Sequence, residues 1–146
     1  MSIFAIDPGE SIGLIWVDDS VRDVDVWGCT LKDARLTNLW DEFELRQPNL
    51  IIYEEFALRQ SAAAKLIGNK FITCEVIGVI KLWAALHCVP LIALRPADKE
   101  YCGFSSNPKD PQFANIKMMY GQRITEHTRD AYRLYRYAKL FKLKEV

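Results

Sequence analysis

Two short, wholly apolar segments of this chain each end at a carboxylic acid. Residues 3–6 run directly into Asp7, and residues 50–53 run directly into Glu54. Short apolar runs bounded by turn-forming residues are typical of strands that are buried on both faces of a sheet. A carboxylate at the end of such a strand is costly to remove from water, so we interpret Asp7 and Glu54 as residues with a chemical role, metal binding above all.

The rest of the chain alternates between strand and helix patterns. The predicted elements are, in order, strands over 2–7, 12–18 and 22–28, a helix over 31–46, a strand over 50–54, one or two helices over 60–87, a strand over 89–94, and helices over 113–119 and 125–143. An antiparallel meander followed by β-α-β crossovers predicts an α/β fold with a mixed five-stranded sheet, whose later strands are parallel, and helices on both faces. This is the strand order of the ribonuclease H-like fold.

The composition fits one folded domain over residues 1–146. Half of the residues are hydrophobic and 26% are charged, which suffices for a compact core. The first apolar run is too short for a signal peptide, and the longest, 76–86, contains Lys81 and is too short to cross a bilayer. We therefore expect a cytoplasmic protein with no membrane partner, whose four cysteines, none in a CxxC pair, are buried free thiols.

The net charge of zero hides a strong asymmetry along the chain. Residues 1–57 contain twelve acidic and four basic residues, whereas residues 58–146 contain seven acidic and fifteen basic ones. The two parts therefore carry charges of −8 and +8. This division suits a basic surface around an acidic centre, as a nucleic-acid partner requires, and equally suits helices whose Lys and Arg are simply solvated.

A third carboxylate, Asp130, follows His127 by three residues in the last predicted helix. Residues three apart lie on the same face of a helix. Three carboxylates with a histidine form an oxygen-rich set that suits hard divalent cations such as Mg²⁺ or Mn²⁺. Each residue also has an ordinary structural interpretation, as a turn residue, a strand-end charge or a helix-surface group.

Three segments resemble motifs of RuvC-type Holliday junction resolvases. Residues 6–13 resemble the opening motif, in which an aspartate ends the first strand and Pro-Gly starts the turn. Residues 47–56 resemble the second motif, in which a Pro-led apolar strand ends at a metal-binding glutamate. Residues 127–131 are similar to the last motif, in which an Asp or His precedes a catalytic Asp-Ala by three residues. The motifs occur in the family's order, while segment 95–124 departs from its pattern.

The resemblance implies a metal-dependent endonuclease that resolves four-way junctions and other branched DNA by paired phosphodiester hydrolysis, leaving 5′-phosphate ends. Paired cuts require two active sites, so a homodimer is expected. The resemblance further implies the cytosol of a bacterium or a phage-infected host. The residues it implies for catalysis and metal binding are Asp7, Glu54, His127 and Asp130. Independently of the resemblance, Lys65 and Lys70 in the long helix and Arg129 and Arg133 in the last helix are candidates for contacts to DNA phosphates, and simple solvation is the alternative for each.

Two Mg²⁺ or Mn²⁺ ions about 3.5–4 Å apart can both activate a water and stabilise the leaving oxygen of a phosphodiester. We expect Asp7 to bridge them, because it ends the central first strand, with Glu54 on one ion and Asp130 on the other. Glu55 is the alternative to Glu54, although the alignment of the apolar run favours Glu54. His127 is expected either to ligate or to act as an acid–base group.

Two other functions use similar residues. A ribonuclease H-like nuclease that cuts RNA–DNA hybrids would need the same carboxylates. A nucleotide-binding, actin-like module also begins with a strand, an acid and a Gly-containing turn, but it usually has two duplicated domains, for which this chain is too short. A catalytically silent DNA-binding relative is a further alternative, and the four intact ligands argue against it.

Overall fold

The structure is a computed structural model that describes residues 1–19, 24–32, 36–56 and 72–143. The strands are β1 (Ser2–Asp7), β2 (Ile12–Asp19), β3 (Val24–Leu31), β4 (Leu50–Glu54), β5 (Leu91–Leu94) and β6 (Ile116–Met118). They form one mixed sheet in the order β5-β4-β1-β2-β3-β6. The first three strands are an antiparallel meander, whereas β4 is parallel to β1, β5 to β4 and β6 to β3.

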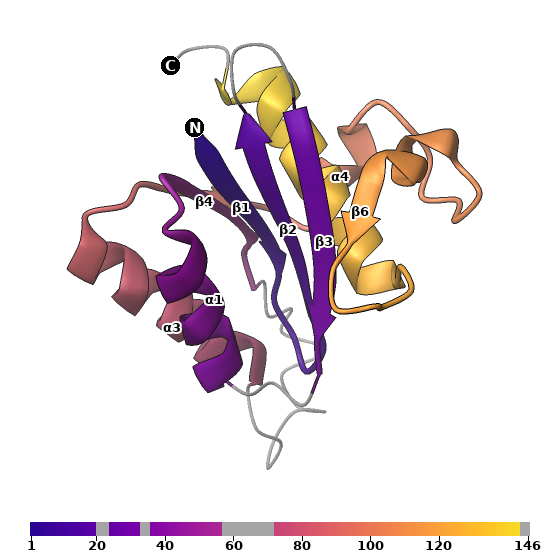
Figure 1. The fold of residues 1–146 in the computed structure, drawn as a ribbon. Helices are drawn as coiled ribbons and strands as arrows, with labels where there is room; N and C mark the ends of the chain where they lie inside the picture. Colours follow the sequence, from indigo (N-terminus) through magenta and orange to yellow (C-terminus); the bar gives the residue numbers. More distant parts are fainter. Residues whose placement is uncertain (20–23, 33–35, 57–71, 144–146) are drawn as a thin grey trace, which may run out of the picture.

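Helices cover both faces of the sheet (Figure 1). The helices α1 (Leu36–Arg46) and α3 (Ile72–His87) lie on one face, and α4 (Glu126–Phe141) lies on the other. Two short 3₁₀ helices, η2 (Asp98–Tyr101) and η3 (Pro111–Asn115), belong to the segment that links β5 to α4. None of the helices in the described ranges is long and apolar enough to cross a membrane.

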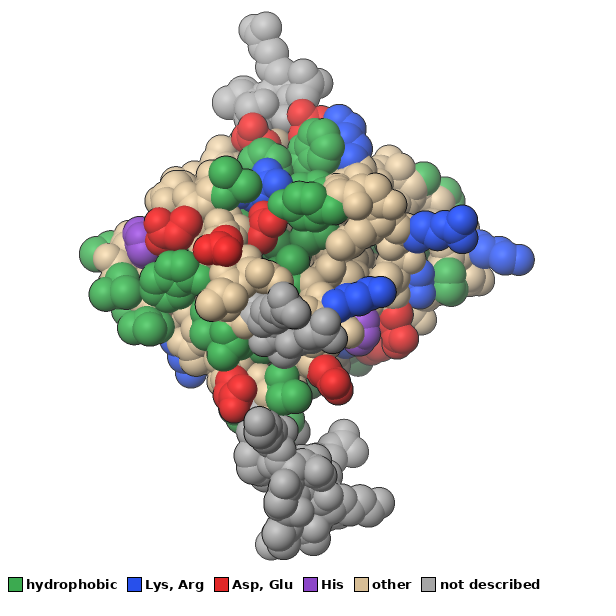
Figure 2. All heavy atoms as spheres, turned by 60° about the horizontal axis from the view of Figure 1, so that its bottom comes forward, with side chains coloured by type: hydrophobic (Ala, Val, Ile, Leu, Met, Phe, Trp, Pro, Cys, Tyr) green, Lys and Arg blue, Asp and Glu red, His purple; other side chains and the backbone are tan. Residues whose placement is uncertain are grey.

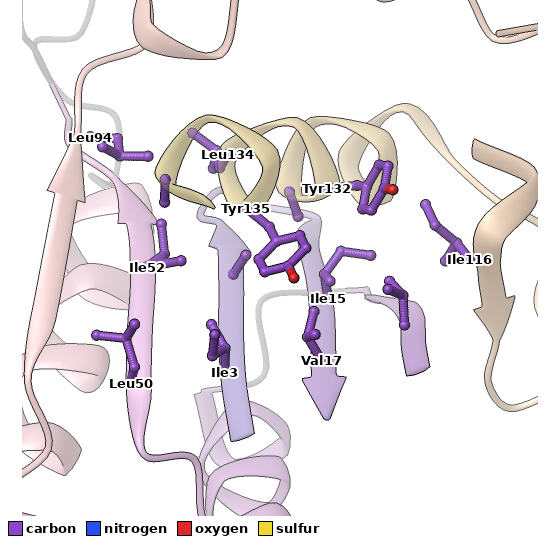
Figure 3. Packing of buried hydrophobic residues seen from close by; sticks show 14 of the residues in the cluster. Ile3, Ile15, Val17, Leu50, Ile52, Leu94, Ile116, Tyr132, Leu134 and Tyr135 are labelled. Atoms are coloured by element: carbon purple, nitrogen blue, oxygen red, sulfur yellow. The ribbon is translucent and has the colours of Figure 1, made fainter. Parts of the chain in front are cut away.

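The alternation of side chains along each strand separates two cores. On the face covered by α4, Ile3, Ile15 and Ile52 pack against side chains of the helix (Figure 3). These are Leu134 and the aromatic rings of Tyr132 and Tyr135. The intervening strand residues face α1 and α3 and form the second core, in which Phe4, Phe43 and Trp83 are packed ring to ring. Because the central strands are apolar on both faces, they read in sequence as continuous hydrophobic runs.

One predicted helix was wrong. Residues 113–119 form the end of η3 and the strand β6, so the sheet has six strands rather than the expected five. Phe113, Ile116 and Met119 are spaced by three residues and are all buried, a pattern that a 3₁₀ turn leading into a strand satisfies as well as an α-helix does. Ile116 fits beside β3 because Gly28 leaves space there: a Cβ on Gly28 would lie 2.8 Å from Ile116 Cγ2.

Other expectations are met in part. Of the one or two helices predicted over 60–87, the structure describes α3, from Ile72 onward. Its residue Val76 is fully buried in the core. The four cysteines are free, as expected, but Cys74 and Cys88 are exposed, and only the other two are buried.

Candidate active site

Asp7 and Glu54 end neighbouring parallel strands on the same side of the sheet. Asp7 follows Ile3 in the odd register of β1, and Glu54 follows Ile52 in the even register of β4, and both of these registers face α4. Their side chains are 14% and 16% exposed. Strand alternation thus points both carboxylates toward the helix that carries the other predicted site residues.

The first turn of α4 is held against β3 by a cluster of hydroxyl groups. The helix begins with Thr125 as its N-cap, whose side chain accepts a hydrogen bond from the Thr128 amide. Thr30 Oγ1 on β3 lies 2.6 Å from Thr125 Oγ1 and 3.0 Å from Thr128 Oγ1. Gln122 adds two hydrogen bonds to the backbone of Thr30. These contacts set where His127 and Asp130, on the exposed side of the same turns, are placed.

Gly13 allows α4 to approach the sheet directly opposite Asp7. The two residues are partners in the β1–β2 ladder. A Cβ on Gly13 would lie 1.9 Å from the carbonyl oxygen of His127, a separation that no side chain tolerates. The close packing brings His127 Nδ1 to 3.4 Å from Asp7 Oδ2. The glycine therefore decides whether the helix and the strand can share a site.

Lys99, on η2, lies among the carboxylates and was not predicted from the sequence. Its Nζ donates to Glu54 Oε2 at 2.9 Å and lies 3.5 Å from Asp130 Oδ2. The Lys99 side chain is only 17% exposed. Burial opposes its charge, but the hydrogen bond to Glu54 and the charges of Glu54, Asp130 and Asp7 together raise the pKa of Lys99. The ammonium is therefore positive at neutral pH.

Arg133, a predicted DNA-contacting residue, is largely buried beside two acidic residues. Its side chain is 3% exposed, with Nη1 at 3.6 Å from Asp130 Oδ1 and Nη2 at 3.2 Å from Glu100 Oε2. Arg133 also lines a surface hollow that Lys99 and Arg129 line, so its contact with DNA stays a prediction. Arg133 pairs with Asp130 within α4 and so orients its carboxylate, since residues three apart in a helix lie on one face.

The pKa of Asp7 is raised by its burial and by the neighbouring acids. Burial, followed by the nearby charge of Glu54 and then that of Asp130, raises the pKa of Asp7 to about 6, although Lys99 and the hydrogen bond with His127 act in the opposite direction. Glu54 and Asp130 are therefore close enough to oppose the ionisation of Asp7. A cation bound between these carboxylates would relieve their repulsion.

The donor chemistry fits a hard divalent cation. Carboxylate oxygens are the ligands that Mg²⁺ and Mn²⁺ prefer, and the ammonium of Lys99 already stands as a cation between Glu54 and Asp130. Across the part of the chain that the structure describes, no three His, Cys, Asp or Glu side chains are arranged as a ready-made metal site. The carboxylates converge, but they are set around a lysine.

Two surface hollows flank the cluster. One, of about 430 Å³, is lined by Asp7, His127, Lys32 and the turn after β1. The other, of about 440 Å³, is lined by Lys99, Asp130, Arg129 and residues around them. Arg129, one of the predicted DNA-contacting residues, is thus at the rim of the cluster. Figure 2, which brings this end of the molecule forward, shows basic and acidic side chains interspersed rather than a continuous basic surface among the described residues.

The structure distinguishes Glu54 from Glu55. Glu55 lines a separate hollow with α3 residues such as Cys74 and Lys81, so Glu54 is the acid that joins Asp7. Lys65 and Lys70, predicted to touch DNA, lie outside the described residues. Gly13 was part of the quoted motif, but nothing in the sequence signalled its contact with α4.

The described sheet, with its antiparallel meander, its parallel later strands and its carboxylates at the ends of β1 and β4, defines a ribonuclease H-like α/β fold of the RuvC type. Thermus thermophilus RuvC in complex with a Holliday junction substrate superposes with a TM-score of 0.70 at 17% identity, over 99% of this chain and 96% of that one. The predicted fold is confirmed.

Two further resolvases have the same fold. The fowlpox virus Holliday junction resolvase has a TM-score of 0.63 at 12% identity and covers 96% of this chain and 99% of that one. The yeast mitochondrial Holliday junction resolvase Ydc2 has a TM-score of 0.59 at 14% identity and covers 92% of this chain and 76% of that one. Comparisons with protein-family models and with curated proteins give no match.

Proposed function

We propose that this protein is a metal-dependent, structure-selective endonuclease that resolves four-way DNA junctions and related branched DNA, leaving 5′-phosphate ends. The observation that carries the proposal is the convergence of Asp7, Glu54 and Asp130, from two strands and a helix, at one edge of a sheet with this topology. Two of the structural neighbours are named as Holliday junction resolvases, and the third is RuvC in complex with a Holliday junction substrate, which supports the choice of substrate.

The same carboxylates are proposed to hold one or two Mg²⁺ or Mn²⁺ ions, with Asp7 as the shared ligand. When bound, such ions activate a water and stabilise the leaving oxygen of a phosphodiester. His127 is 43% exposed and contacts Asp7, so it is placed to accept or deliver a proton at the reacting phosphate. Arg129, at the rim of the cluster, is proposed to contact a phosphate of the DNA.

Paired cutting further requires two copies of the site, so we propose a homodimer. The outer side of α3 offers an apolar contact surface, because Leu82 and Leu86 are 55% and 64% exposed. Analytical ultracentrifugation of the protein and of its Leu82→Glu variant tests this step. A dimer that the substitution converts to monomers supports the assignment, whereas a monomeric wild-type protein contradicts it.

The activity is tested by cleavage of end-labelled substrates in Mg²⁺, in Mn²⁺ and in EDTA. A four-way junction, a flap, a linear duplex and an RNA–DNA hybrid are compared at equal concentration. Paired, symmetric nicks in the junction, absent in EDTA, support the proposal. A preference for the hybrid would assign the protein to a different ribonuclease H-like activity, and cleavage that survives EDTA would refute the metal dependence.

A further inference from the structure

Lys99 places a positive charge between two of the clustered carboxylates, Glu54 and Asp130. Its Nζ lies 2.9 Å from Glu54 Oε2 and 3.5 Å from Asp130 Oδ2, and its charge also acts on Asp7. The lysine and both acids are at least four-fifths buried. A partly buried ammonium between two carboxylates is held far more firmly than a surface ion pair.

The backbone that carries Lys99 is anchored independently of the cluster. Asp98 is buried and accepts hydrogen bonds from the Arg95 amide at 2.8 Å and from the Arg95 guanidinium at 3.0 Å. On the other side, Glu100 is paired with the buried Arg133. The short helix η2 is therefore anchored before and after Lys99, so displacement of the ammonium requires only the lysine side chain to move.

Asp130 divides its two oxygens between two cations. Oδ1 faces Arg133, at 3.6 Å, and Oδ2 faces Lys99, at 3.5 Å. If the Lys99 ammonium moves away, Asp130 keeps its orientation through Arg133, and Oδ2 becomes available to another cation. Lys99 also lines the hollow of about 440 Å³ beside the cluster, which gives the side chain a place to go.

We propose that Lys99 is a built-in counter-cation: it neutralises Glu54 and Asp130 in the metal-free protein, and a divalent ion binds these two acids only by displacing its ammonium. This inference rests on the proposed metal-dependent function. It has two consequences. Lys99 lowers the affinity for the ion, and it stabilises the fold when the ion is absent. Released into the adjacent hollow, its charge then lies beside Arg129, which is proposed to contact a DNA phosphate.

The test measures binding of Mn²⁺ alone, by isothermal titration calorimetry, to the full chain, to Lys99→Met and to Lys117→Met. Lys117 is the matched control, because it also pairs with an acid, Asp25, at 2.8 Å, but at the exposed edge strand β6. Lys99→Met is expected to bind Mn²⁺ about tenfold more tightly than the wild type, since the ion no longer competes with an internal partner. Lys117→Met is expected to match the wild type.

Thermal unfolding gives a second readout. In EDTA, Lys99→Met is expected to melt several degrees below the wild type, and saturating Mn²⁺ is expected to close that gap. Equal or weaker Mn²⁺ binding by Lys99→Met overturns the counter-cation proposal while leaving the proposed function intact. Failure of both proteins to bind Mn²⁺ overturns the metal-dependent function as well.

Lysine labelling of the wild-type protein avoids any dependence on how the variant folds. Mass spectrometry after brief acetylation, with and without Mn²⁺, compares the reactivity of Lys99 and Lys117. Displacement predicts that Mn²⁺ raises the reactivity of Lys99 at least about threefold, because the amine leaves a buried ion pair, and that it leaves Lys117 unchanged. Unchanged labelling of Lys99 in protein that has bound Mn²⁺ contradicts the proposal.

Discussion

The two faces of the sheet are packed in different ways. On the α4 face, glycines at 13 and 28 bring the helix into contact with strand backbone and side chains, where a Cβ would meet atoms at 1.9 Å and 2.8 Å. On the other face, α1 and α3 pack through large side chains such as Phe43 and Trp83, and Gly78 of α3 has nothing within 4 Å of an added Cβ. Among the glycines that the structure describes, an added Cβ would come closer than 3.0 Å to another atom only at 13 and 28, both on the face that carries the polar cluster.

The difference matters because a catalytic arrangement tolerates little displacement, whereas a hydrophobic core tolerates substitutions that keep its volume. The α4 face holds every carboxylate of the proposed site within reach of Lys99 or His127. The α1 and α3 face contributes burial and supports the strands from behind. Substitutions on the two faces should therefore have different effects, on activity in one case and on stability alone in the other.

The largest expected effect is the loss of cleavage in Asp7→Asn. Removing the charge of the proposed shared ligand should lower the rate of junction cleavage by about a thousandfold or more, as measured by single-turnover assays in Mg²⁺. Asp25→Asn is the control, because Asp25 is a half-exposed acid of β3 that pairs with Lys117. A wild-type rate in Asp7→Asn would show that the α4 face does not carry the active site as proposed.

Gly13→Ala should be the most damaging change to the packing. The new methyl group would overlap the His127 carbonyl, so α4 must shift away from β2, at a cost of about 3 kcal/mol in the free energy of unfolding. Cleavage should fall with it, because His127 and Asp130 move with the helix. Urea unfolding monitored by circular dichroism measures the first effect.

Gly78→Ala is the matched substitution on the opposite face. Gly78 is exposed on α3, and an added methyl group would have nothing within 4 Å. Replacing a helical glycine by alanine should raise stability by up to about 1 kcal/mol. The comparison between the faces fails if the two glycine substitutions change the unfolding free energy in the same direction.

Neighbouring glutamates provide a sharper test of the register. Glu54→Gln should lower junction cleavage about a hundredfold, because it removes one proposed ligand. Glu55→Gln should remain within about twofold of the wild type, because Glu55 lines the hollow beside α3 instead. If Glu55→Gln lost activity and Glu54→Gln did not, in the same single-turnover assay, the site would lie on the face of β4 that is turned away from α4.

The smallest effect concerns pH. The pKa of Asp7 is raised to about 6 from an ordinary value of 3.8, so protonation of Asp7 stabilises the fold. The stabilisation is complete below the ordinary value and is lost as the pH rises through 6. In EDTA, acidification from pH 7.5 to 5 should therefore stabilise the wild type by about 1 kcal/mol relative to Asp7→Asn, which parallel urea titrations can measure. Identical pH profiles would show that the ionisation of Asp7 is unopposed.

Much of the site was predictable because its determinants are local. Apolar runs that end at Asp7 and Glu54 indicate buried strands, and strand alternation then decides which carboxylates share a face. The spacing of His127 and Asp130 in an amphipathic helix indicates their common face in the same way. The strand over 116–118 was mistaken for helix because its buried residues recur every three positions, and only pairing with β3 distinguishes the two.

The sequence by itself determined the order of the first five strands and of the main helices, and the identity of the acids, since these depend on periodicity and on the cost of burying charge. Only the tertiary structure decided that Lys99 stands between Glu54 and Asp130, that Arg133 is buried beneath Asp130, and that Gly13 admits the carbonyl of His127. Lys99 lies 31 residues from Asp130 and 45 from Glu54, and Gly13 meets a helix far along the chain. Arg133 and Asp130 are three residues apart in α4, and it is the docking of this helix that buries the guanidinium. Periodicity carries no information about such contacts, because they follow from how the elements dock.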